Sequence, residues 1–98
     1  MPLPKILVWF TSDDYDAIKS LAPQDPKLPD AFDDWLKLAT DEITELGIQG
    51  IAFRTVIINS HGLSAYCNTS GVNPDSVGRG AYAVYLDRYN HDRGAKST

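Results

Sequence analysis

The sequence predicts a small α+β domain with the element order β-α-α-β-α-α. Its 98 residues, with 43% hydrophobic content, match one ordinary globular domain. Two short runs rich in β-branched and aromatic residues predict strands, and four longer segments have apolar residues at helical spacing. Residues 1–90 should form this domain. Residues 91–98 contain no large apolar residue, so they should form a flexible tail.

The two predicted strands cover residues 6–10 and 51–58. Both are apolar on both faces, with Arg54 as the exception, so both faces should be covered by helices. Neighbouring strands joined through a helical pair should be parallel. Because a two-stranded sheet is marginal on its own, we expect a third strand or an extension of the sheet by dimerisation.

The first two helices are expected over residues 12–22 and 30–46. Thr11 or Ser12 should cap the first helix, and Gly47 should end the second. Prolines interrupt the helical pattern between them and predict a stiff connector; they are Pro23, Pro26 and Pro29. The first helix should turn inward Tyr15, Ile18, Leu21 and Ala22. The second should turn inward Phe32, Trp35, Leu36, Ala39, Ile43 and Leu46.

The last two helices are expected from residue 59 or 60 to 69, and from the start signal at residues 73–76 to residue 89 or 90. Asn59 or Ser60 should cap the third helix, and Gly71 lies just past its end. Its inward residues should be Leu63, Tyr66 and Cys67.

Composition and charge exclude several classes of protein. The net charge is −4, and it is uneven: residues 1–50 have a balance of −6 and residues 51–98 one of +2. This is far from the dense basic surface typical of nucleic-acid binding. Cys67 is the only cysteine, so no intramolecular disulfide and no zinc site with cysteine spacing is expected, and no cofactor is indicated. No export signal or membrane span is visible, which predicts a cytoplasmic protein.

Few residues point to catalysis or to metal or anion binding. His61 and Cys67 lie about 240° apart on a continuous helix, so they should not form a nucleophilic pair. Ser60 and His61 follow a strand, where α/β enzymes place catalytic groups, but Ser60 is also explained as a helix cap. The sequence Gly78-Arg79-Gly80 resembles part of an anion-binding turn but lacks the spacing of a phosphate-binding loop. Its two glycines are better explained by the close approach of another backbone segment than by anion binding. The acidic residues of the second helix fit a solvated helix face better than a cation site; they are Asp30, Asp33, Asp34, Asp41, Glu42 and Glu45.

The fourth helix carries two apolar faces, although a surface helix needs only one. One is a stripe of Arg79, Tyr82, Leu86, Tyr89 and Arg93; the other consists of Val77, Ala81, Val84 and Tyr85. Tyrosine and arginine are enriched at protein interfaces, so the stripe is the candidate binding surface. A helix wedged into a small core can also be apolar on most sides, and this alternative stays open.

These observations favour a non-catalytic protein-interaction domain, homodimeric or bound to another protein, with the stripe as its interface. Two alternatives remain. The last two helices could act as a nucleic-acid-binding or regulatory pair carrying Arg79, Arg88 and Arg93, or a weak hydrolase site could form around His61.

Overall fold

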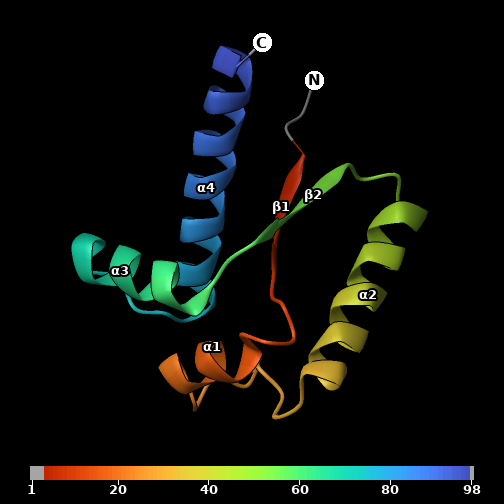
Figure 1. Cartoon of the computed structure of the whole chain (residues 1–98). Helices are drawn as coiled ribbons and strands as arrows, with labels where there is room; N and C mark the ends of the chain where they lie inside the picture. Colours follow the sequence, from red (N-terminus) through yellow and green to blue (C-terminus); the bar gives the residue numbers. More distant parts are fainter. Residues whose placement is uncertain (1–3, 98) are drawn as a thin grey trace.

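The computed structural model describes residues 4–97, and the side chains of residues 4–90. It has the predicted element order and one two-stranded sheet (Figure 1). The elements are β1 (Lys5–Trp9), α1 (Tyr15–Leu21), α2 (Phe32–Ile48), β2 (Phe53–Ile57), α3 (Ser60–Ser70) and α4 (Ser76–Ser97). The prediction of a single α+β domain with this order is confirmed.

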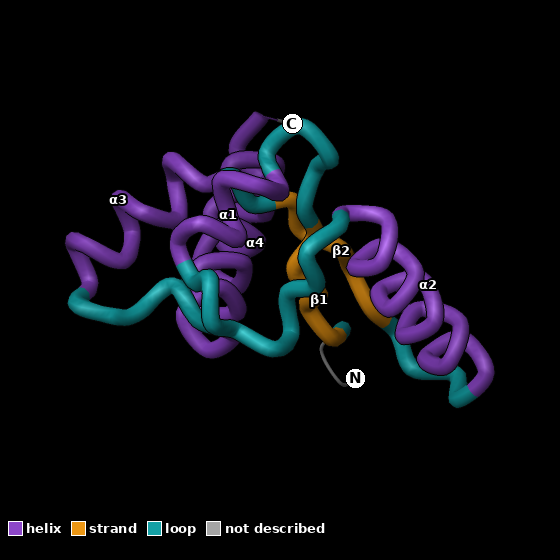
Figure 2. The backbone as a smooth tube through the Cα atoms, turned by 90° about the horizontal axis from the view of Figure 1, so that it is seen from below, coloured by secondary structure: helices purple, strands orange, loops and turns teal. Residues whose placement is uncertain are grey.

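The two strands are parallel, as predicted, with Ile6 beside Arg54 and Trp9 beside Ile57. Trp9 packs edge-to-face on Trp35 of α2, with ring centroids 5.0 Å apart. Arg54, on the opposite face, forms a 2.8 Å ion pair with Asp87 of α4. The sheet is therefore the middle layer between α2 and α4 (Figures 1 and 2).

The strands are shorter than expected, and β2 is less covered. Its Thr55 and Ile57 are exposed, the latter to 58%. The expectation that both faces of this strand are covered is therefore wrong at these two positions. No third strand lies within residues 4–97, so the described part of the chain leaves each strand with one unpaired edge.

The first helix starts at Tyr15, later than predicted, and its side-chain cap is absent. Asp14 occupies the cap position, but its carboxylate instead accepts hydrogen bonds from the backbone amide and hydroxyl of Ser60, at 2.6 and 2.7 Å. Asp14 thus joins the start of α1 to the start of α3, where it places negative charge at the helix N-terminus. Asn59 caps α3 as predicted, because its side chain accepts from the Gly62 amide at 2.6 Å.

The proline-rich connector consists of two consecutive turns. The Asp25 amide donates to the Ala22 carbonyl, and the Leu28 amide donates to the Asp25 carbonyl, both at 3.1 Å. Pro23 and Pro26 therefore each occupy the second position of a β-turn, which their fixed φ favours. The connector is fastened to α1 because the Lys19 ammonium donates to the Leu28 carbonyl at 2.8 Å.

An aromatic cluster forms one half of the core. The Trp35 ring centroid lies 4.8 Å from that of Phe10 and 6.1 Å from that of Tyr15, which is fully buried. Tyr15 also donates a 2.5 Å hydrogen bond to the Pro29 carbonyl. The inward residues predicted for α1, α2 and α3 are all buried or half-buried. Burial and aromatic contacts thus tie β1, α1 and α2 together.

Two helices continue past their predicted ends. Helix α2 runs through Gly47 to Ile48, and α4 runs to Ser97 instead of ending near residue 90. No proline occurs after residue 74, so nothing in the sequence enforces an earlier end to α4. The predicted flexibility of the tail, residues 91–98, stays a prediction.

The start of α4 depends on a close backbone approach at Gly78. A β-carbon at this position would lie 1.8 Å from the carbonyl oxygen of Asn73, whereas one at Gly80 would meet no atom within 4 Å. The Gly78 amide donates to the Asp75 carboxylate at 3.0 Å, which caps the helix. The close approach predicted for these two glycines is therefore confirmed for Gly78 and not for Gly80.

Replacing the two glycines by alanine should have opposite effects on stability. Gly78→Ala should lower the free energy of unfolding by about 1–3 kcal/mol, since the backbone must move to remove the overlap. Gly80→Ala should raise it by up to about 1 kcal/mol, because alanine has the higher helix propensity. Urea denaturation measures both. If the Gly78→Ala protein is as stable as the original, the Asn73 carbonyl does not lie against Gly78.

Candidate functional site

Helix α4 has two apolar faces, and the structure shows which one is internal. Arg79 and Tyr82 of the predicted stripe are only 4% and 7% exposed, and Ala83 beside them is fully buried. On the other face, Val77 and Tyr85 are 78% and 53% exposed. The expectation that Arg79 and Tyr82 lie on an exposed interface is therefore corrected: this chain covers them itself, and the surplus surface is the other face.

Arg79 is held inside by an ion pair. Its Nη2 atom lies 2.8 Å from Oδ2 of Asp25, and its Nη1 atom donates to the Pro74 carbonyl at 2.9 Å. The Asp25 side chain is only 10% exposed, and its Oδ1 atom accepts from the Lys27 amide at 2.9 Å. The pair joins the proline-rich connector to the first turn of α4. Arg79 therefore has a structural role and is not accessible to a binding partner.

Tyr82 is wedged between α4 and α3. Its hydroxyl occupies the space that a β-carbon at Gly62 would need. Its ring lies 5.1 Å from that of Tyr66, measured between centroids. Burial raises the pKa of Tyr82, and the neighbouring Tyr85 raises it further. Tyr82 therefore serves as a packing residue that sets the spacing of the two helices.

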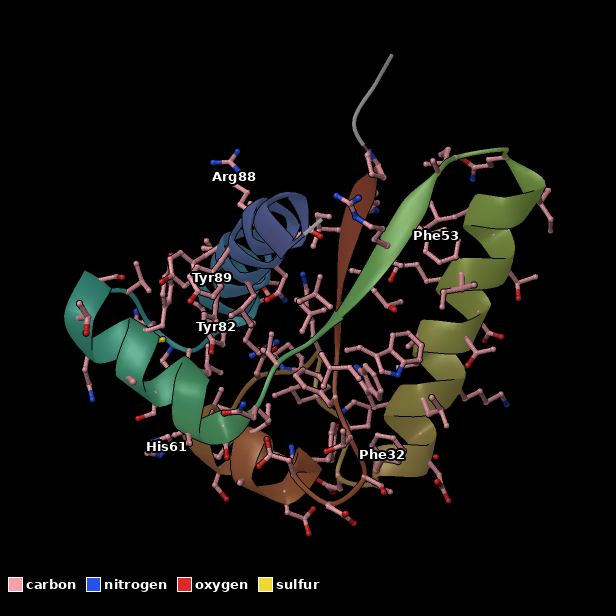
Figure 3. All side chains as sticks on the ribbon, turned by 45° about the horizontal axis from the view of Figure 1, so that its top comes forward. Phe32, Phe53, His61, Tyr82, Arg88 and Tyr89 are labelled. Carbon is pink, nitrogen blue, oxygen red and sulfur yellow. The ribbon has the colours of Figure 1, made fainter. Side chains whose placement is uncertain are left out.

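Exposed rings continue outward from Tyr82 and form what we call the tyrosine surface. It consists of Tyr66, Ala81, Val84, Tyr85, Arg88 and Tyr89. The rings of Tyr85 and Tyr89 are stacked 17° from parallel with centroids 6.5 Å apart, and Tyr85 lies 5.6 Å from Tyr66. Figure 3 shows Tyr89 along the same helix as Tyr82, with Arg88 extending away from the body.

Two hollows flank Tyr85. One, of about 440 Å³, lies among the residues of the tyrosine surface. The other, of about 400 Å³, lies between α3 and α4 beside Ala65, Thr69 and Ser70. Tyr85 therefore borders two depressions while it remains 53% exposed.

Leu86 and Tyr89, two of the other three residues of the predicted stripe, differ in their exposure. Leu86 is half-buried and packs against the core, whereas Tyr89 is 49% exposed. The side chain of Arg93 lies outside the described residues. Of the predicted interface, Tyr89 is thus the residue that also belongs to the tyrosine surface, and its binding role stays a prediction.

The proposed hydrolase residues do not converge. His61 is exposed and points away from the body (Figure 3), while the Ser60 hydroxyl donates to Asp14. Cys67 is buried, and burial, with a smaller effect of Asp75, raises the pKa of its thiol. A raised pKa disfavours the thiolate, so the buried Cys67 lacks the ionisation that a nucleophilic cysteine needs.

The acidic residues do not form a metal site. Within the described residues, no group of three or more histidine, cysteine or carboxylate side chains converges on a point. Nor is any helix in the described part of the chain long and apolar enough to cross a membrane.

Comparisons with known proteins provide no relative. No family model matches the chain, and no curated protein or solved structure is significantly similar to it. The site is therefore argued from its geometry alone.

Sequence reasoning missed two of the important residues. Asp25 was read only as part of an acidic half, since nothing in its neighbours signals a partner 54 positions away. Tyr66 was assigned to the core of α3, although it also lies at the edge of the tyrosine surface. The rule that a charged residue on an apolar helix face needs a partner could have pointed from Arg79 to a buried acid.

The Asp25–Arg79 pair should make stability depend on pH in the acid range. Burial alone would raise the pKa of Asp25, but the Lys27 hydrogen bond and the Arg79 charge outweigh it and hold the pKa below 3.8. The unfolded state therefore binds the proton more readily. The stabilisation is complete above the unfolded pKa and is lost as the pH falls through the folded pKa. Urea midpoints between pH 2 and 6 should show a steeper acid-side fall for the natural protein than for Asp25→Asn; equal slopes would contradict the pairing.

Proposed function

We propose that this protein is a non-catalytic interaction domain that forms a homodimer through the tyrosine surface. The observation that carries the proposal is the exposure of Tyr85 and Tyr89 on a helix whose opposite face is already buried. Their exposed area is not needed for the core of one chain. Tyrosines combine a large apolar area with a hydroxyl that tolerates water, which suits a surface that is covered only on binding.

The arrangement favours a second copy as the occupant. A twofold interface needs a surface that is complementary to itself. The exposed Tyr85 ring and the two hollows that it borders meet this need, because the ring of one copy can lie against a hollow of the other. Contact with the tilted Tyr66 ring and stacking on Tyr89 restrict the Tyr85 ring before binding, so little side-chain entropy is lost on association.

The nucleic-acid alternative is less well supported. Of the three arginines that it needs, Arg79 is neutralised by Asp25 inside the fold and Arg88 is exposed; the side chain of Arg93 lies outside the described residues. The net charge of −4 also opposes a phosphate backbone.

The double variant Tyr85→Glu/Tyr89→Glu should weaken dimerisation by about 1,000-fold, since each ring is expected to contribute about 2 kcal/mol at the centre of the interface. Sedimentation equilibrium measures the dissociation constant. The matched control is Ile48→Glu/Ile51→Glu, which adds the same charge at two exposed apolar residues outside the tyrosine surface. A natural protein that stays monomeric at millimolar concentration, or a dimer equally weakened by the control, would refute the proposal.

A further inference from the structure

A second binding surface lies along the unpaired edge of β1. The Lys5 amide donates to the Ala52 carbonyl and the Trp9 carbonyl accepts from the Ile58 amide, so alternate residues of β1, starting at Lys5, face β2. Backbone polar groups of a strand alternate in direction. The amides and carbonyls of Ile6 and Val8 therefore point away from β2, toward an edge that no described strand covers.

A cleft of about 290 Å³ lies beside β1. Its floor is formed by four consecutive residues, Leu7, Val8, Trp9 and Phe10. One wall is α2, which contributes Trp35, Leu38, Ala39 and Glu42, and one end is closed by the connector and the start of α4. Leu38 is 59% exposed although it lines this cleft. Unpaired backbone groups beside exposed apolar side chains are what an added strand would cover.

The charge around the cleft identifies the kind of strand. Leu38 has Asp34, Asp41, Glu42 and Glu45 at helical spacings of three, four and seven residues, so all four acids lie on its side of α2. Three lysines border the same region: Lys5, which pairs with Glu42 at 3.5 Å, Lys27, and Lys37, which lies three residues after Asp34 and four before Asp41 on α2. The acids outnumber these lysines, and Arg79 is already neutralised by Asp25. The wall is therefore acidic.

This charge disfavours a second copy of the chain at the same edge. Two β1 strands paired edge to edge about a twofold axis would bring the two α2 helices together on one face of the joint sheet. Both helices carry the same acidic residues, so they would repel each other. A basic strand from another protein has the complementary charge.

We infer that β1 accepts an extended basic segment of a partner protein as a third strand, with its lysines or arginines on the α2 face of the sheet, where their alkyl stems cover Leu38 and their charged ends meet the acids of α2. Backbone hydrogen bonds to Ile6 and Val8 supply the pairing, and the acidic wall selects the charge. This inference is independent of the tyrosine surface, which lies on α3 and α4.

The test uses a synthetic octapeptide in which lysine and valine alternate, titrated into the full-length protein and followed by amide NMR shifts. The lysine peptide should bind at least about tenfold more tightly than the same peptide with glutamate for lysine, because of the acidic wall. The largest shifts should fall on Ile6, Val8 and Leu38. N-methylation of alternate peptide amides should abolish binding, since it removes the donors that pair with the edge.

The variant Val8→Pro removes one backbone amide that points to the open edge, and it leaves every hydrogen bond between β1 and β2 intact. It should weaken binding of the lysine peptide by about tenfold. Thr55→Pro is the matched control, because its amide points away from β1 at the opposite edge; binding should be unchanged. If either proline variant is unfolded, Asp41→Asn/Glu42→Gln decides instead, with Asp16→Asn/Asp33→Asn as its charge-matched control. Three results would overturn the inference. They are equal affinity for the N-methylated peptide, NMR shifts confined to the tyrosine surface, and unchanged peptide affinity in Asp41→Asn/Glu42→Gln.

Discussion

The buried ion pair between Arg79 and Asp25 determines how α4 is oriented in this protein. A guanidinium that is 4% exposed must face its carboxylate, because an unpaired charge in the core costs several kcal/mol. With Arg79 turned inward, Tyr82 and Ala83 also face the core, and Val77, Ala81 and Tyr85 must face outward. The exposed tyrosine surface is therefore a consequence of where one charge is buried.

The same pair is one of the long-range contacts that stabilise this small fold. A two-stranded parallel sheet has little stability of its own, so its helices must be fastened by other contacts. Asp14 joins α1 to the start of α3, and the Asp25–Arg79 pair joins the connector to α4. Each contact links segments that are far apart in the sequence. The aromatic rings packed around Trp35 add the apolar contacts between β1, α1 and α2.

Much of the fold could be predicted because local signals carried it. β-Branched runs identified the strands, helical spacing identified the inward faces of three helices, and Asn59 identified a cap. The site could not be predicted in the same way. The sequence indicated two apolar faces on the fourth helix. Which of them is internal depends on the ion pair between Arg79 and Asp25, which is 54 positions away in the sequence. The cap expected at Thr11 or Ser12 failed for a similar reason, since Asp14 at the helix start is engaged with distant Ser60. Partners remote in sequence decided the features that local patterns left open.

The most direct test of this account is a double-mutant cycle on Asp25→Leu and Arg79→Met, with the free energy of unfolding measured in urea at pH 7. Each single variant strands a charge in the core and should lose about 3 kcal/mol or more, while the double variant should lose clearly less than the sum. The account predicts a coupling energy of at least about 2 kcal/mol between the two residues. Additive losses, with a coupling below about 0.5 kcal/mol, would show that this pair does not orient α4.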